Sequence, residues 1–144
     1  MKLLNSALLL RDSENWGFAT VDLMCIDLFS GETCFYKYGA APSYIRTGKT
    51  VRRVKGVSMA AGILAEEGAT PDVVRMRLRP GGVALIASDG VAPRDDDGWI
   101  REALLEFDGG DTRALARSVI RQAGEKYGCT DDMTVLAVRV EERR

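Results

Sequence analysis

The sequence Val-Ala-Leu-Ile-Ala-Ser-Asp-Gly at residues 83–90 decides the fold more than any other stretch of the chain. Its first five residues are apolar and follow a Pro-Gly-Gly turn at 80–82, which predicts a short central strand over Val83–Ala87. Asp89 comes directly after this strand, and Gly90 allows the backbone to turn beside the carboxylate. Because an unpaired charge at a buried strand end is costly, Asp89 is expected to have either a hydrogen-bonding cap or a cation.

A second acidic stretch, Cys-Thr-Asp-Asp-Met-Thr at residues 129–134, leads into the last predicted strand, Met133–Val140. If the two strands lie side by side and antiparallel, the end of one lies beside the start of the other, so that Asp89 and Asp131 converge. In a chain without histidine, two convergent carboxylates favour Mg²⁺ or Mn²⁺ over zinc. Each stretch alone is a common acidic turn, and their order beside two apolar strands is what favours a metal site.

The rest of the chain predicts hairpins and separate helices, which together indicate an α+β domain built on antiparallel sheet. An opening helix starts near Leu3 and ends before Gly17. Two hairpins follow, one of strands at 18–28 and 33–38 and one of strands at 43–46 and 51–54. A mobile connection at 56–68 then leads to a strand at 74–79. Two helices are predicted after the central strand, one at 99–107 and one that begins at Thr112, which is expected to be its N-cap.

Several side chains allow more than one interpretation. The strand at 18–28 is apolar on both faces, which predicts burial on both sides, and Cys25 and Cys34 are interpreted as small core residues. The arginine row at 75, 77 and 79 forms either a solvated face or a phosphate-binding face. The acidic run at 95–97 is either a solvated loop or a site for an extra metal or a basic partner, and Trp99 is expected to anchor its helix in the core.

Composition excludes several classes of protein. The 144 residues suffice for one domain, and the net charge of −1 suggests no general affinity for nucleic acid or anionic membrane. The absence of histidine excludes a Ser-His-Asp triad, a phosphohistidine intermediate and His-ligated zinc. Three cysteines without a CxxC spacing fit a reducing compartment, and the N-terminus does not look like a signal peptide, so a cytoplasmic location is expected.

The two acidic motifs resemble those of the type 2C, metal-dependent protein phosphatase family, which has Ser-Asp-Gly after a strand and Asp-(Asn/Asp)-Met-(Ser/Thr) before the last strand. Here these are residues 88–90 and 131–134. The chain is more closely similar to the stage II sporulation protein E family of phosphatases. That resemblance rests on Leu-Leu-Asn-Ser at 3–6, Phe-Ala-Thr-Val-Asp-Leu at 18–23, Gly-Ala-Ala-Pro-Ser-Tyr-Ile at 39–45 and Gly-Ile-Leu at 62–64.

The resemblance implies an antiparallel β-sandwich flanked by helices, a four-layer αββα fold. It also implies two Mn²⁺ or Mg²⁺ ions that activate a water for in-line attack on a phosphoserine. Asp89 and Asp131 match the family's metal ligands, and Gly90 and Asp132 match supporting positions, where Asp132 orients the loop. The family also needs an earlier Asp-Gly whose aspartate bridges the ions, and none precedes Asp89. Residues 1–140 are therefore expected to be the C-terminal two-thirds of a phosphatase domain that lacks its first strands, and 141–144 a frayed tail.

The implied parent protein, which could carry a membrane anchor, dephosphorylates an anti-anti-sigma factor and so activates a sporulation sigma factor. The chain alone is expected to be inactive, because the bridging ligand is absent from it. The alternative is a phosphatase-like interaction or dimerisation module without catalysis. In either case, incomplete sheets would leave an unpaired edge, so a homodimer or larger oligomer is expected, with no nucleic-acid or membrane contact by this chain.

Overall fold

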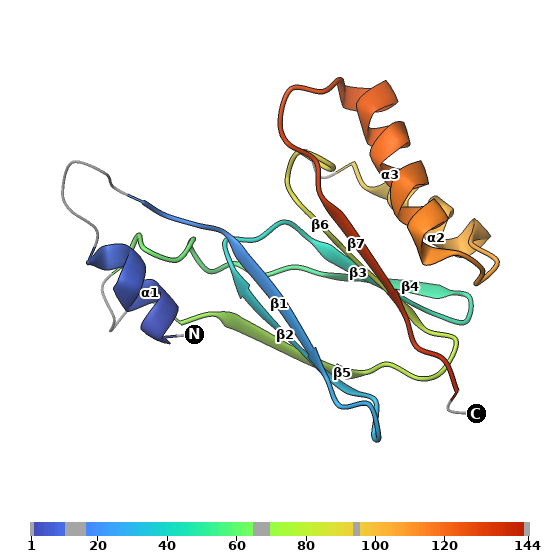
Figure 1. Ribbon diagram of the computed structural model, residues 1–144, viewed down its shortest axis with the longest axis horizontal. Coiled ribbons are helices and arrows are strands. Elements are labelled where there is room, and N and C mark those ends of the chain that lie inside the picture. The colour runs from blue at the N-terminus through green and yellow to red at the C-terminus, as the bar shows by residue number, and fades with distance from the viewer. Residues whose placement is uncertain (1, 11–16, 65–69, 94–95, 143–144) are drawn as a thin grey trace. The chain divides into compact units, whose positions relative to one another are not determined.

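The computed structural model describes residues 2–10, 17–64, 70–93 and 96–142 (Figure 1). The chain divides into two compact units, each with its own antiparallel sheet. The first unit comprises Met1–Ala41 and Lys55–Arg77, and the second comprises Pro42–Val54 and Leu78–Arg144. Both candidate aspartates, Asp89 and Asp131, therefore belong to the second unit.

The first unit contains the predicted opening helix, α1 (Lys2–Leu9), and a three-stranded sheet. The sheet has the order β1-β2-β5 and consists of β1 (Val21–Ile26), β2 (Glu32–Tyr38) and β5 (Asp72–Arg77). The predicted hairpin of the first two strands and the strand that follows the connection are both confirmed. Asn5 fixes the helix to the later segment, because its side-chain amide donates to the Leu64 carbonyl (3.1 Å) and accepts from the Gly62 amide (2.8 Å).

The prediction that both faces of the first strand are buried is wrong. β1 is the outer strand of its sheet among the described residues, and its Leu23 and Cys25 are exposed on one face. Cys34, opposite Cys25 on β2, is half-buried, so neither cysteine is a core residue. An apolar run predicts a strand, but it cannot tell whether another layer covers each face of that strand.

Asp72, the first residue of β5, organises part of the connection between β4 and β5. Its Oδ2 accepts hydrogen bonds from the amides of Val57 (2.7 Å) and Ser58 (2.6 Å), and these bonds lower the pKa of the carboxyl. A Cβ on Gly56 would lie 2.6 Å from the same oxygen, so a larger residue there would displace the carboxylate from these two bonds. Of the predicted mobile connection, residues 65–69 lie outside the described residues.

We expect the contribution of Asp72 to stability to disappear at low pH. Because the folded-state pKa lies below the unfolded value of about 3.9, the stabilisation is fully present above that pH and is lost as pH falls through the folded pKa. Asp72→Asn should destabilise the chain by about 1–2 kcal/mol at pH 7. In urea titrations from pH 7 to pH 2, the difference between the two proteins should shrink below about pH 4. A constant difference across that range would contradict this role.

The second unit contains a four-stranded sheet of order β4-β3-β6-β7 and two helices. Its strands are β3 (Ser43–Thr47), β4 (Thr50–Val54), β6 (Val83–Ala87) and β7 (Val135–Arg139), and its helices are α2 (Gly98–Glu106) and α3 (Thr112–Tyr127). The helices pack along this sheet (Figure 1). Their shared core includes Tyr44, Val83, Leu85, Val91, Ile100, Leu104, Leu115, Val119 and Ala123. The predicted second hairpin, central strand, two helices and last strand are confirmed.

Two details of the helices differ from expectation. The N-cap of α3 is Asp111, whose carboxylate accepts from the Arg113 amide (2.8 Å), and Thr112 is the first helical residue. Both side chains can act as caps, so the sequence alone did not separate adjacent candidates. Ile120 of α3, whose apolar side chain would be expected in the core, is 36% exposed. Trp99 packs against the core as expected, and its indole donates to the Tyr127 hydroxyl (3.3 Å).

Arg46 of β3 caps the C-terminal end of α2. Its guanidinium donates to the carbonyls of Leu104 (3.1 Å) and Phe107 and lies over the Phe107 ring, 5.5 Å from the centroid. The last carbonyls of a helix have no partner within the helix, and a cation at that end also interacts favourably with the helix dipole. This contact joins the sheet to α2 across 58 and 61 residues of sequence.

Removing this cap should destabilise the second unit. We expect Arg46→Met to lower the free energy of unfolding by about 2–3 kcal/mol, because it leaves two carbonyls without their charged donor. Arg52→Met, an exposed change on the neighbouring strand, is the matched control and should cost less than about 0.5 kcal/mol. Equal losses from the two variants in urea unfolding would show that the contact of Arg46 with α2 is unimportant.

Within the described residues, no helix is long and apolar enough to span a bilayer.

Candidate metal centre

The site predicted from the sequence lies where β6 ends and β7 begins. The two strands are antiparallel neighbours, with Ala87 opposite Val135. The ladder continues beyond the assigned strands, because the Ser88 amide donates to the Thr134 carbonyl (3.0 Å). The loop that carries Asp89 therefore leaves the sheet beside the segment that carries Asp131, as the strand pattern predicted.

Ser88 joins the segment that carries Asp89 to the segment that carries Asp131 by two hydrogen bonds. Its hydroxyl accepts from the Thr134 amide (2.9 Å) and donates to the Asp132 carbonyl (3.2 Å). One side chain on the first acidic segment thus satisfies two backbone groups on the second. The apolar pattern of the strand does not reveal this role of Ser88, although a hydroxyl at the end of such a strand is a signal for bonds of this kind.

Gly90 is required for close approach, which is a different reason from the one predicted. Its φ is not in the left-handed region, so the turn itself does not demand glycine. A Cβ at this position would lie 2.5 Å from the Asp132 carbonyl oxygen and 3.4 Å from Cβ of Asp131. The absence of a side chain therefore lets the two acidic segments pack directly against each other.

The carboxylates themselves are accessible. Asp89, Asp131 and Asp132 are all exposed, so the expected cost of a buried charge at this strand end does not arise. Asp131 Oδ1 accepts from the Asp132 amide (2.8 Å), which leaves its other oxygen available. Oxygen donors on two adjoining segments fit a hard divalent cation. Among the described residues, no three histidine, cysteine or acidic side chains gather as a metal cluster, so this pair offers only part of a coordination shell.

Other acidic residues of the second unit have partners of their own. Asp96 forms an ion pair with Lys126 (2.9 Å), and Asp97 forms one with Arg53 (3.0 Å). Asp108 Oδ1 accepts from the Gly110 amide (2.7 Å). The described part of the acidic run is therefore more than a solvated loop, because it attaches the start of α2 to β4 and α3. Asp95 lies outside the described residues.

Solved structures that resemble this fold include phosphatase domains. The phosphatase domain of the cell fate determinant SpoIIE from Bacillus subtilis (Mn presoaked) matches with a TM-score of 0.75 and 28% identity, over 99% of this chain and 66% of that one. The catalytic domain of the serine/threonine phosphatase PstP in complex with two manganese ions matches with a TM-score of 0.77 over 96% of this chain and 67% of that one. At 17% identity, the PstP match concerns the fold alone. The expected α+β phosphatase fold is confirmed.

The chain belongs to the stage II sporulation protein E family, whose model matches residues 1–141. Stage II sporulation protein E of Bacillus subtilis (strain 168) is 31% identical over 98% of this chain. The protein of the same name from Priestia megaterium is 29% identical over 98% of it. The chain spans 18% and 25% of the length of these two relatives.

Proposed function

We propose that this chain is the C-terminal part of a metal-dependent protein serine/threonine phosphatase domain, with Asp89 and Asp131 as metal ligands. The main support is the β6–β7 junction, where Ser88 and Gly90 hold two exposed aspartates on adjoining segments. Family membership adds to this support, since a solved relative is a phosphatase domain soaked with manganese. Of the adjacent residues Asp131 and Asp132, Asp131 is the metal ligand in this proposal. Asp132 contributes through its backbone carbonyl, which positions the loop.

In this proposal the residues of the chain place oxygen donors for Mn²⁺ or Mg²⁺ at one edge of the sheet. When bound, such ions make a nucleophile available at neutral pH and offset the negative charge of the phosphoryl group. Ser88 keeps the two segments in register, and Gly90 keeps them in contact. The exposure of both carboxylates leaves room for a phosphorylated protein to approach.

The proposed reaction of the parent protein is hydrolysis of phosphoserine on an anti-anti-sigma factor, which then activates a sporulation sigma factor. Membership of the sporulation family supports this choice of substrate. A cytoplasmic location of this chain is part of the proposal, whether or not the parent is anchored to a membrane. Incubating the purified full-length protein with the phosphorylated anti-anti-sigma factor and Mn²⁺, and measuring released phosphate, tests the proposal. Release that does not depend on divalent metal would contradict it.

The chain alone should have no measurable phosphatase activity. Two carboxylates are an incomplete ligand set for a two-metal centre, and no Asp-Gly precedes Asp89 to provide a bridging ligand. Loss of one member of a catalytic unit typically costs several orders of magnitude in rate. The measurement is phosphate release from a phosphoserine protein by the 144-residue chain with Mn²⁺, with the full-length protein as the positive control. Turnover by the chain at a rate comparable to that control would contradict this prediction.

The alternative function is a phosphatase-like interaction or dimerisation module. It is favoured by β1, an outer strand among the described residues, and by the hairpin tip beside it, where Leu28 and Phe29 are 83% and 92% exposed. A calorimetric Mn²⁺ titration of the chain and its Asp89→Asn and Asp131→Asn variants distinguishes the two, because a module without catalysis requires no metal binding. The phosphatase proposal instead requires metal binding that depends on Asp89 and Asp131, whatever the oligomeric state.

A further inference from the structure

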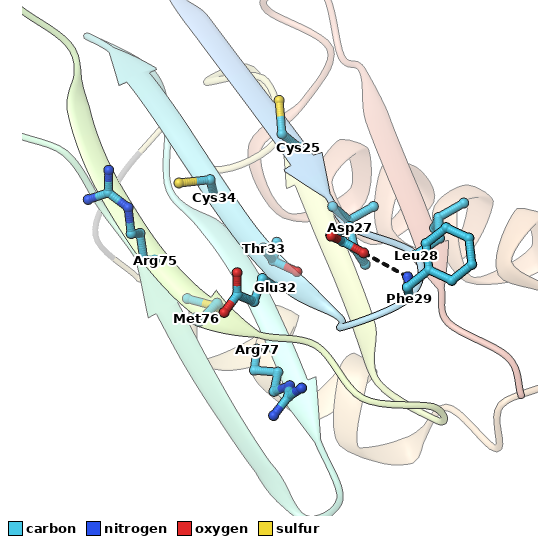
Figure 2. Close-up of a pocket in the computed structure, with 11 residues that line it drawn as sticks. Cys25, Asp27, Leu28, Phe29, Glu32, Thr33, Cys34, Arg75, Met76 and Arg77 are labelled. Carbon is cyan, nitrogen blue, oxygen red and sulfur yellow. Dashed lines mark hydrogen bonds between the residues drawn. The ribbon is translucent and has the colours of Figure 1, made fainter.

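The open face of the first unit's sheet carries two free thiols directly opposite each other. Cys25 on β1 and Cys34 on β2 are register partners in an antiparallel pair. Opposite residues in such a pair have Cα atoms about 4.5–5.5 Å apart, and disulfides form when Cα atoms are about 4.4–6.8 Å apart. Figure 2 shows the two side chains on neighbouring strands, with Arg75 on the next strand, and Arg75 is the register partner of Cys34.

Both thiols lie on the same face as Tyr36. The Tyr36 pKa is raised, chiefly by the hydrogen bond between its hydroxyl and Cys34 and to a smaller degree by the nearby Cys25. Cys25 is exposed and Cys34 is half-buried, so a reagent in solvent reaches Cys25 first. Because a cysteine side chain has a single rotatable bond to its sulfur, each thiol can turn toward the other without a change of backbone.

The two cysteines also line a pocket of about 830 Å³ that is built entirely from the first unit. Arg75 and Arg77 line the same pocket (Figure 2), and the Arg77 guanidinium donates to the Ser30 carbonyl (2.6 Å). Arg75 is exposed and supplies positive charge beside the thiols. Asp27 and Glu32 line the pocket as well, so its overall charge is balanced. Arg75 is the cation directly beside the thiols, as the register partner of Cys34, and a small disulfide with carboxylate groups can place one of them there while its sulfur meets the exposed thiol.

We propose that Cys25 and Cys34 form an oxidisable dithiol site that reacts with an anionic small-molecule disulfide to give a cross-strand disulfide. The Cys25 thiolate attacks one sulfur of the small disulfide, whose S–S bond breaks and releases one thiolate. The Cys34 thiolate then attacks Cys25 sulfur in this mixed disulfide and releases the second thiolate. The two cysteines are oxidised and the small disulfide is reduced to two thiols. Exposed disulfides are readily reduced again, so the reaction is reversible.

The site can be tested on the folded chain with oxidised glutathione, followed by alkylation with iodoacetamide and peptide mass mapping. The chain has three cysteines, and we expect only Cys129 to be alkylated after oxidation, with Cys25 and Cys34 linked within one molecule. In Cys34→Ser, the reaction should stop at a glutathione adduct on Cys25. Alkylation of all three thiols, or linkage only between molecules, would overturn the proposal.

The role of Arg75 is tested by the rate of oxidation. Arg75→Gln should slow the reaction with oxidised glutathione by about threefold and leave the reaction with neutral bis(2-hydroxyethyl) disulfide unchanged. Arg79→Gln, an exposed arginine that does not line the pocket, should change neither rate. If Arg75→Gln slows neither reaction, the preference for an anionic disulfide is wrong. If Arg75→Gln slows the reactions with both disulfides equally, the effect comes from altered structure, and the preference for an anionic disulfide is again wrong.

Discussion

Replacing Asp131 by asparagine in the full-length protein is expected to lower kcat/KM toward the phosphorylated substrate by about 10³-fold or more. The change preserves shape but removes the charge of a proposed metal ligand, and the contribution of a metal centre depends on its complete ligand set. Asp89→Asn should have an effect of similar size, because the two carboxylates serve the same centre. Initial rates of phosphate release at saturating Mn²⁺ provide the measurement.

The chain contains a matched control for this substitution. Asp132→Asn makes the same chemical change one residue along, at a carboxylate that is also exposed. The contact of this residue with Ser88 uses its backbone carbonyl, which the substitution keeps. We expect less than a threefold change in rate, in keeping with a residue that acts through its backbone. Equal losses for Asp131→Asn and Asp132→Asn would contradict the assignment of Asp131 as the ligand.

Gly90→Ala should cause a large loss of stability in the second unit from the addition of a single methyl group. The added Cβ would lie 2.5 Å from the Asp132 carbonyl oxygen, and this neighbour is backbone rather than a flexible side chain. Since the two segments must separate to admit the methyl group, we expect a loss of about 2–4 kcal/mol in urea unfolding. Mn²⁺ binding should weaken as well, because Asp131 moves with its segment.

Gly98→Ala serves as the control for this change. Gly98 is the first residue of α2, and a Cβ there would have no neighbour within 4 Å. Alanine favours helix, so this variant should be neutral or slightly more stable. If Gly90→Ala proves as neutral as Gly98→Ala, then the two acidic segments are not packed as the structure indicates.

Local sequence patterns were sufficient to predict most of the elements and the meeting of the two acidic segments. The apolar run Val83–Ala87 and the alternation before Val140 predicted neighbouring strands, and their antiparallel pairing brought the two acidic motifs together. This inference succeeded because strand order and direction constrain where loops emerge. Two short motifs therefore located the candidate centre without any knowledge of side-chain contacts.

Features that depend on distant neighbours were not predictable in the same way. Cys25 and Leu23 have an apolar pattern, but their exposure depends on what covers the outer strand of the sheet. Arg46 reaches the end of a helix that begins about fifty residues later, and nothing in its local sequence indicates this contact. The role of Gly90 was likewise misread, because a close approach to Asp132 is a property of the paired segments.

The most direct test of the metal centre is an NMR titration of the 144-residue chain with Mn²⁺, which broadens the signals of nearby nuclei. Line broadening reports where the ion binds, even if the incomplete site binds it weakly. We predict that the amides of Asp89, Gly90, Asp131 and Asp132 broaden together at the lowest Mn²⁺ concentrations, before those near Asp97 and Asp108. Broadening that begins at another acidic loop, or at only one of the two segments, would contradict a shared metal centre at the β6–β7 junction.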